Sequence, residues 1–259
     1  MDDKVSETGP ALTFRQSLTW TAHLFKAVIR QYHKDLGAKL APLIARDAVI
    51  VDVGAHSGQH SKLFAGMAPD GHVYAFEPGA YARSILSRMV RLRGLSNVTV
   101  VPFGMSDKAS TETLHVPLKR SGTMGFGLSH IGADNDDGRA TATETIQLTT
   151  LDIFAEAQKL TRLDFVKVDI EGWEAHFLKG ALGTIKRLRP IVLIEVVEHV
   201  LARAGTTPAD IFDAMAPLDY VAFENSEHDG YVMRRVEGFR HSMDIMFVPS
   251  EKAHLVDAE

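Results

Sequence analysis

Residues 51–58 read VDVGAHSG, and this stretch indicates the fold more clearly than any other part of the chain. It ends an apolar run at 48–54 and opens a helical pattern at 57–68. A glycine at a strand-to-helix turn lets the backbone approach a ligand closely, and the first turn of a helix offers free N–H donors. We therefore expect a nucleotide-like ligand at the first strand-to-helix turn of an α/β sheet.

The alternation of strand and helix patterns continues along the chain. Runs rich in Val and Ile recur at residues 72–78, 97–104, 164–172 and 189–196. Helical patterns lie between them, at residues 80–93, 173–187 and 208–216. Continuous apolar runs are typical of strands covered on both faces, and their alternation with helices predicts a doubly wound, mostly parallel sheet. Two last runs, 220–224 and 244–249, have no helical pattern between them and predict an antiparallel pair at one edge of the sheet.

Composition narrows the class of protein. The 259 residues are 45% hydrophobic and 24% charged, which is typical of a soluble globular protein that can bury a core. The absence of cysteine excludes disulfides, thiolate zinc sites and a cysteine nucleophile. A net charge of −5 without a long Lys/Arg run makes nucleic acid an unexpected partner. The polar first residues and the lack of an apolar run of about 20 residues predict a cytoplasmic protein without a membrane span.

The N-terminal 45 residues fall outside the alternation, and we expect a helical extension (1–45) before the main domain (46–259). Apolar residues follow one stripe of residues 12–45: Phe14, Leu18, Phe25, Val28, Tyr32 and Leu36. Lys26, Arg30 and Lys34 form a basic row on another face. A helix on a membrane surface is one interpretation, but a docked helix with a solvated charged side is favoured because polar residues dilute any lipid face.

A second segment, residues 119–142, is rich in Gly, Ser and Asp. It lies between apolar fragments at 114–118 and 144–154. Loops of this length inside compact domains tend to be lids or binding loops. We expect a lid-like loop here, which with the N-terminal helix would form and cover the pocket for a second substrate.

Glu77 narrows the identity of the ligand. It ends the second strand, 23 positions after Gly54, where a carboxylate can accept both hydroxyls of a ribose; a solvated strand-end carboxylate is the alternative. Dinucleotide sites need G-x-G-x-x-G, because the middle glycine must admit a pyrophosphate. Here the spacing is G-x-x-x-G, with His56 at the position that should lack a side chain. This argues against NAD or FAD and is compatible with S-adenosylmethionine.

Taken together, six ordered motifs resemble the FkbM-type methyltransferases. They are VDVGAHSG (51–58), YAFEP (74–78), NVTVVPFGMSD (97–107), TLD (150–152), VKVDIEGWE (166–174) and RPIVLIEV (189–196). The resemblance covers roughly residues 48–249. It implies the class I, Rossmann-like S-adenosylmethionine-dependent methyltransferase fold, a seven-stranded sheet whose last two strands are the antiparallel pair. The family's usual asparagine after Gly-Ala is His56 in this chain.

The resemblance also implies cofactor-binding residues. The methionine end of the cofactor would be lined by Asp52, Gly54, Ala55 and His56. Glu77 would hold the ribose hydroxyls, with Pro78 beside the adenine. The adenine edge would be lined by Gly104, Met105 and Asp107. All of these residues end parallel strands on one edge of the sheet, where open α/β sheets bind ligands.

The densest polar cluster is Lys167, Asp169 and Glu171, which strand alternation puts on one side of the fourth strand. Burying these charges without partners or a functional role would cost free energy of folding. A structural ion pair is one interpretation. In the other, Asp169 and Glu171 lie beside the reacting methyl group, where they orient the nucleophile, take its proton or help to hold a metal.

His199, after the fifth strand, is a further candidate base, because the pKa of histidine lies near working pH; it is equally compatible with the surface of the next helix. His56 and His60 have the spacing of a helical zinc pair, but we expect no metal ligands because residues 57–58 serve the turn. The dependence on a divalent metal and the choice of base stay open at this point.

These features favour an S-adenosylmethionine-dependent methyltransferase with S-adenosylhomocysteine as product. The family resemblance implies O-methylation of a hydroxyl on a sugar, glycolipid or polyketide-like metabolite, so the expected partner is a small-molecule or glycan acceptor. Two alternatives are an NAD-dependent oxidoreductase on a similar sheet and a non-catalytic binding module that kept the fold. The sequence does not fix the oligomeric state.

Overall fold

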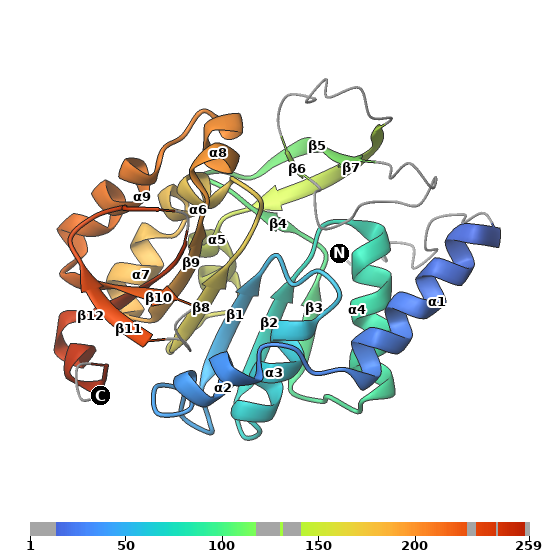
Figure 1. Cartoon of the computed structure of the whole chain (residues 1–259), viewed down its shortest axis with the longest axis horizontal. Coiled ribbons are helices and arrows are strands. Elements are labelled where there is room, and N and C mark those ends of the chain that lie inside the picture. Colours follow the sequence, from blue (N-terminus) through green and yellow to red (C-terminus); the bar gives the residue numbers. More distant parts are fainter. Residues whose placement is uncertain (1–13, 118–129, 132–140, 227–231, 242, 257–259) are drawn as a thin grey trace.

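An eight-stranded sheet in the order β11-β10-β12-β9-β8-β1-β2-β3 forms the centre of the molecule (Figure 1). This computed structural model describes residues 14–117, 130–131, 141–226, 232–241 and 243–256. The parallel strands are β1 (Val49–Val53), β2 (His72–Phe76), β3 (Val98–Val101), β8 (Phe165–Val168) and β9 (Ile191–Val196). The antiparallel strands are β10 (Tyr220–Ser226), β11 (Val232–Val236) and β12 (Met243–Pro249). The expected α/β class is confirmed, with one strand more than the expected seven because β11 pairs with β10.

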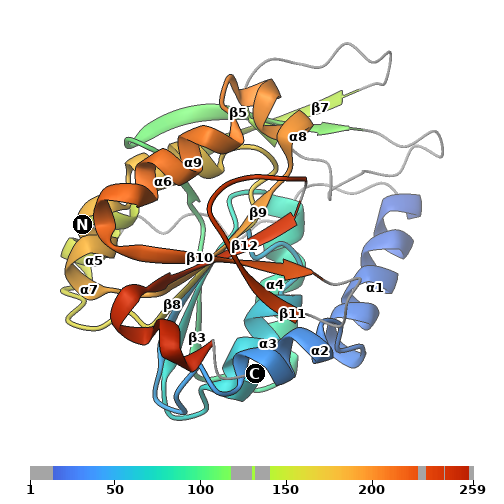
Figure 2. The same cartoon turned by 60° about the vertical axis from the view of Figure 1, so that its left-hand side comes forward.

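Helices cover both faces of this sheet, as its continuous apolar strands require. One face packs against α2 (Lys34–Leu40), α3 (Gln59–Met67), α4 (Ala80–Leu92) and the 3-10 helix η4 (Ser250–Leu255). The other face packs against α5 (Leu151–Ala157), α6 (Glu174–Lys179), α7 (Leu182–Leu188), α8 (Glu198–Leu201) and α9 (Pro208–Met215). Short 3-10 turns follow α8 and α9, η2 (Ala202–Ala204) and η3 (Ala216–Leu218). Figure 2 shows the two helix layers on either side of the fanned strands.

The helix expected at 173–187 is two helices, α6 and α7. The chain turns at Gly180, whose backbone packs so closely on that of Ser106 that a Cβ atom there would lie 2.1 Å from the Ser106 carbonyl oxygen. This contact depends on a distant segment, so the local helical pattern could not reveal it.

A second sheet with the order β4-β7-β5-β6 stands beside the carboxyl ends of the main strands (Figure 1). Its strands are β4 (Gly104–Met105), β5 (Ser110–Pro117), β6 (His130–Ile131) and β7 (Thr141–Thr149). The fragments at 114–118 and 144–154 therefore belong largely to an antiparallel pair, β5 and β7. The expected lid-like loop 119–142 lies outside the described residues, apart from β6 and the first residues of β7.

The N-terminal extension forms α1 (Phe14–Ile29) and α2, and α1 is docked on α4 as expected. The Trp20 indole N–H donates to Ser84 Oγ at 2.8 Å. Lys62 of α3, whose side chain is buried, donates from Nζ to the carbonyl oxygens of Ala27 (2.6 Å) and Arg30 (2.5 Å). A cation is favourable at the C-terminal end of a helix, because the last backbone carbonyl groups there lack hydrogen-bond partners within the helix.

The expected apolar stripe of this extension is wrong for three of its members. Leu18, Phe25 and Tyr32 are exposed, Val28 is partly buried and Leu36 is buried; the side chain of Phe14 lies outside the description. Within α1 the side packed on the core holds Trp20, Leu24 and Ala27, so Leu18 and Phe25 face away from it. Beyond Ile29 the helical phase is interrupted, because α2 starts only after His33, which has a left-handed φ of 58°. No helix in the described part of the chain has the length and apolar character needed to cross a membrane.

Candidate active site

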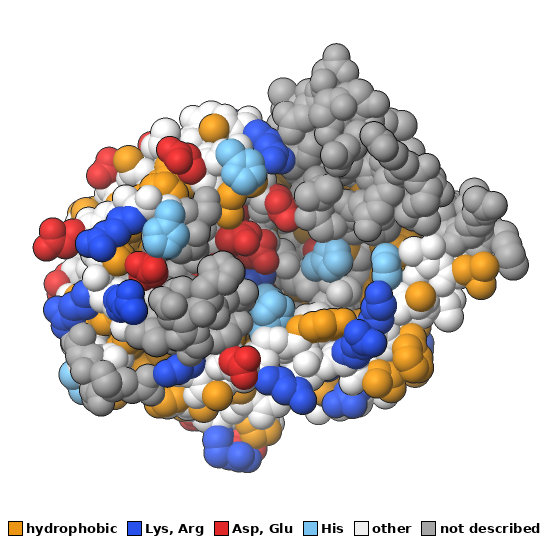
Figure 3. All heavy atoms as spheres, in the orientation of Figure 1, with side chains coloured by type: hydrophobic (Ala, Val, Ile, Leu, Met, Phe, Trp, Pro, Cys, Tyr) orange, Lys and Arg blue, Asp and Glu red, His pale blue; other side chains and the backbone are white. Residues whose placement is uncertain are grey.

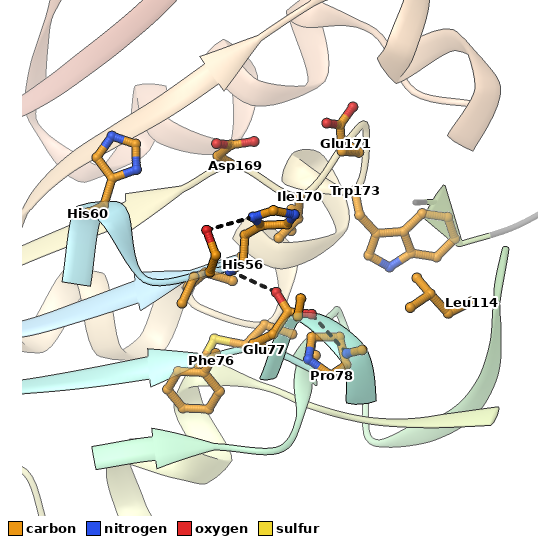
Figure 4. Close-up of a pocket in the computed structure, with 18 of the residues that line it drawn as sticks. His56, His60, Phe76, Glu77, Pro78, Leu114, Asp169, Ile170, Glu171 and Trp173 are labelled. Carbon is orange, nitrogen blue, oxygen red and sulfur yellow. Dashed lines mark hydrogen bonds between the residues drawn. The ribbon is translucent and has the colours of Figure 1, made fainter. Parts of the chain in front are cut away.

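A pocket of about 300 Å³ opens at the carboxyl ends of β1, β2 and β8 (Figure 4). The second sheet and the turn before α6 contribute its remaining walls. The ends of parallel strands are where open α/β sheets bind ligands, because strand ends and helix N-termini meet there. The pocket therefore lies at the edge that the strand-end residues predict.

The turn after β1 forms the floor of the pocket. Gly54 has a left-handed φ of 78°, and a Cβ atom at this position would lie 1.9 Å from the carbonyl oxygen of Asp169. His56 also has a positive φ, 49°, a conformation that residues other than glycine rarely adopt. Gly54, Ala55 and His56 all line the pocket.

Glu77 is held at the end of β2 by backbone donors. Its Oε2 accepts a hydrogen bond from the backbone N–H of His56, and its Oε1 accepts one from that of Gly79, both at 2.8 Å. The side chain is only 8% exposed, and this burial raises its pKa to about 7. Each carboxylate oxygen can accept a second hydrogen bond, so Glu77 keeps acceptor capacity for a ligand's hydroxyl groups.

The strand ends after β2 and β3 contribute a further wall. Pro78, Gly104 and Met105 line the pocket there. Asp107 corrects the expectation that it lies along this wall: it is exposed, accepts a hydrogen bond from Ser106 Oγ at 2.9 Å and does not line the pocket. Ser106 Oγ also accepts from the indole N–H of Trp173 at 2.9 Å, which places that ring in the pocket wall.

Buried charges lie beneath the pocket. Lys167 Nζ lies 3.0 Å from Asp169 Oδ2 and 3.8 Å from Asp52 Oδ1. Asp52 is fully buried and accepts from Ser61 Oγ at 2.5 Å. It therefore supports the floor of the pocket, which corrects the expectation that it lines the pocket. Lys167 and Asp169 form the expected ion pair, and both also line the pocket.

Burial and the neighbouring charges shift the pKa values of Asp169, Asp52 and Lys167. Burial opposes the ionisation of Asp169, but the adjacent Lys167 ammonium outweighs it and lowers the pKa of Asp169. Burial raises the pKa of Asp52. The pKa of Lys167 is raised, because Asp169 and Asp52 outweigh the burial that would lower it.

Glu171 reaches the pocket from a strained turn. Its φ is 54° and that of Gly172 is 104°, and non-glycine residues in this region are held by their surroundings, often at functional sites. The buried carboxylate of Glu174 holds the turn, since its Oε1 accepts from the backbone N–H groups of Ile170 (3.0 Å) and Gly172 (3.2 Å). Burial and then the charge of Asp169 raise the pKa of Glu171 to about 7.

These features agree with the comparisons with known proteins. A family model described as "Methyltransferase FkbM domain" matches residues 52–226. The chain belongs to the FkbM methyltransferase family. The resemblance drawn from the six motifs is thereby confirmed, and the N-terminal extension precedes the matched region.

Two curated relatives match this FkbM chain. Hexuronic acid methyltransferase AglP of Haloferax volcanii is 27% identical over 168 residues, 64% of this chain and 60% of that protein. Methyltransferase sdnD of Sordaria araneosa is 30% identical over 153 residues, 51% of this chain and 59% of that protein. The matched region thus spans about 60% of each relative.

A solved structure supports the fold. Methyltransferase FkbM from Methylobacillus flagellatus KT superposes with a TM-score of 0.52 at 14% identity, over 89% of this chain and 59% of that one.

His199 is the third candidate base of this FkbM protein. It is exposed on the short helix α8 and does not line the pocket, so of the two alternatives for this residue the structure supports the surface of the next helix and not a base. Glu195, near the end of β9, lies close to Asp169 but does not line the pocket. Burial and the neighbouring Asp169 charge raise the pKa of Glu195.

Histidines and apolar side chains complete the wall. The rings of His33 and His60 stack with centroids 4.3 Å apart, and burial lowers the pKa of His60 to about 2, so this ring is neutral. In Figure 3, histidines lie beside a group of acidic side chains near the centre of the visible face. Leu114 and Val116 of β5 also line the pocket; nothing in the sequence indicated that a second sheet would bring them there. Among the described residues, no group of three or more His, Asp and Glu side chains is placed to hold a metal ion.

A smaller cavity of about 150 Å³ adjoins the pocket, and we refer to it as the α1 annex. It lies between α1 and the starts of α3 and α4, with His23, Lys26 and Ala27 on the α1 side. His56 and Tyr81 line both spaces, and the Tyr81 hydroxyl lies 3.2 Å from His23 Nδ1. The N-terminal extension therefore contributes directly to the walls of the site.

Proposed function

We propose that this protein is an S-adenosylmethionine-dependent O-methyltransferase that methylates a hydroxyl group of a sugar-like acceptor. The observation that carries the proposal is Glu77, a buried carboxylate held by two backbone N–H groups beside the Gly54 turn. This arrangement suits a ligand that presents a pair of neighbouring hydroxyl groups, as a ribose does.

The residues fit this cofactor. Gly54 packs directly on the backbone of Asp169, which brings the turn after β1 and the carboxylate of Asp169 into the wall of one pocket. Glu77 would hold the ribose hydroxyls, Pro78 and Met105 would contact the adenine, and Ala55 and His56 would contact the methionine end. When bound, S-adenosylmethionine supplies an electrophilic methyl group on a sulfonium sulfur.

Glu171 is the proposed general base. A base works best when its pKa lies near the operating pH, and the pKa of Glu171 is about 7. Asp169 is held as a carboxylate by Lys167, so it is suited to accepting a hydrogen bond from the acceptor hydroxyl and orienting its oxygen. The proton of that hydroxyl would pass to Glu171, and such a base contributes about 10²–10⁴-fold to a rate.

The acceptor would lie against the second sheet, Trp173 and the α1 annex. Apolar side chains such as Leu114 can pack against a sugar ring, while His23 and Lys26 of the annex offer polar contacts. A sugar is favoured among the acceptors implied by the family because one relative is named a hexuronic acid methyltransferase. Residues 1–45 are proposed as an extension that completes this part of the site.

Calorimetric titration tests the proposal. The purified protein is titrated with S-adenosylhomocysteine and, separately, with NAD. We expect binding of the former alone, a loss of about tenfold or more in affinity for Glu77→Gln, and unchanged affinity for Asp107→Asn, a carboxylate outside the pocket. Binding of NAD alone would favour an oxidoreductase, and binding of neither would favour a module that kept the fold without the cofactor.

A further inference from the structure

Helix α1 carries two apolar faces on opposite sides. At 3.6 residues per turn, one side holds Trp20, Leu24, Ala27 and Val28. These four residues are buried or packed against the core that α1 shares with α4. The opposite side holds Leu18, Ala22, Phe25 and Ile29, which we call the outer face of α1.

The outer face is open to solvent. Leu18 is 58% exposed, Phe25 68% and Ile29 62%, and Ala22 between them is exposed too. A docked helix ordinarily presents polar residues on the side away from the core. Large apolar side chains that cluster on a surface mark an interaction site, whereas single ones carry no such meaning. The outer face therefore has the character of an interaction site.

Basic side chains flank the outer face. Lys26 and Arg30, which adjoin this face, are both exposed. The sequence of α1 contains no Asp or Glu. Figure 3 shows hydrophobic side chains next to Lys and Arg on the right-hand side, where Figure 1 places α1. Because the whole chain has a net charge of −5, this positive edge is a local feature.

We propose that the outer face of α1 binds an anionic lipid surface. A second copy of the chain would bring Lys26 and Arg30 against a helix without acidic residues, which like charges disfavour. An anionic lipid surface complements both features, since Phe, Leu and Ile enter the boundary of the acyl chains while Lys and Arg meet the head groups. The helix would lie in the plane of the surface.

Lipid binding through the outer face would also determine how the pocket is positioned relative to the lipid surface. His23 and Ala27 line the α1 annex from the inner side of the same helix, and Lys26 lies between the annex and the outer face. A chain held by the outer face would thus keep the annex next to the lipid surface. The lipid binding itself does not depend on the proposed methyl transfer.

Co-sedimentation with vesicles tests the proposal on the full chain. Vesicles of phosphatidylcholine alone are compared with vesicles of equal parts phosphatidylcholine and phosphatidylglycerol. We expect binding to the anionic vesicles only, weakened by salt. Phe25→Ser/Ile29→Ser and, separately, Lys26→Glu/Arg30→Glu should each lower the partition coefficient by about tenfold or more. Ile153→Ser, which removes an apolar side chain 49% exposed on α5, should leave it unchanged.

Other outcomes overturn the proposal. Equal binding to both kinds of vesicle would show that the basic residues play no part in binding. Binding to neither would show that the outer face does not bind a lipid surface. If analytical ultracentrifugation instead found a dimer that Phe25→Ser/Ile29→Ser dissociates, the outer face would belong to a second copy. Thermal unfolding of each variant shows whether it is folded, and Phe25→Ser alone serves where the double variant is not.

Discussion

The carbonyl oxygen of Asp169 lies 1.9 Å from the position that a Cβ atom on Gly54 would occupy. The two residues end neighbouring parallel strands, β1 and β8, and their backbones meet only because Gly54 has no side chain. This contact joins the cofactor turn expected after β1 to the carboxylates after β8. One glycine therefore sets the distance between the two halves of the site.

Gly54→Ala should destabilise the protein. The methyl group would meet backbone, and φ at this position is 78°, so we expect a loss of about 2–4 kcal/mol in the free energy of unfolding. Urea denaturation measures it. Gly66→Ala is the matched control, since Gly66 lies in α3 with nothing within 4 Å of its Cβ position, and it should gain about 0.5–1 kcal/mol. Equal stability of the two variants would contradict this account of residue 54.

Lys167→Met should remove the cation that compensates two carboxylates. Asp52 is fully buried, and Lys167 Nζ lies within 4 Å of it and of Asp169. Breaking a buried pair leaves an unpaired charge, which costs about 3–5 kcal/mol of unfolding free energy. Lys167→Met/Asp52→Asn should recover part of this loss in the same denaturation experiment. If the double variant were less stable than the single one, the charge of Asp52 would not be the cause.

The fold could be predicted from the sequence because its strands are short apolar runs separated by helical patterns. Periodicity indicates such elements locally, so β1, β2, β8 and β9 were placed within a few residues. The break between α6 and α7 and the antiparallel sheet around β5 and β7 depend on contacts between distant segments. Local patterns contain no information about those contacts.

The candidate site was predictable where residues end parallel strands. Topology brings Gly54, Glu77 and Asp169 to one edge, whatever the details of packing. The pattern could not distinguish a residue beside the pocket from one beneath it, so Asp52 and Asp107 were expected in the wall. His33 and Leu114 come from the N-terminal extension and the second sheet, whose positions no strand pattern fixes.

Glu174→Gln should change how stability depends on pH. Burial raises the pKa of Glu174 to about 7 in the folded state, against 4.5 in the unfolded chain. The folded state therefore holds the proton more tightly, so this group favours folding most at low pH, and its contribution falls as pH rises from 4.5 to 7. Glutamine can still accept the two backbone hydrogen bonds and does not titrate.

The stability of Glu174→Gln relative to the native chain should therefore rise with pH, by about 3 kcal/mol between pH 4.5 and pH 8. Urea denaturation of both proteins over this range measures the difference, and the contributions of Glu77 and Glu171 cancel between them. Parallel stability curves would show that Glu174 does not titrate with a raised pKa.

Lys62→Met should loosen the N-terminal helix without disturbing the sheet. The Lys62 ammonium donates to the carbonyl oxygens of Ala27 and Arg30 at the end of α1, and methionine keeps the apolar stem but leaves both acceptors unpaired. We expect a loss of about 1–3 kcal/mol in the free energy of unfolding. Relative to the native chain, amide exchange should become faster in α1 and change less in β1. Arg46→Met, which breaks the exposed pair with Asp70, should change stability by less than about 0.5 kcal/mol. Unchanged exchange in α1 would mean that the apolar contacts of Trp20 and Leu24 suffice to dock this helix.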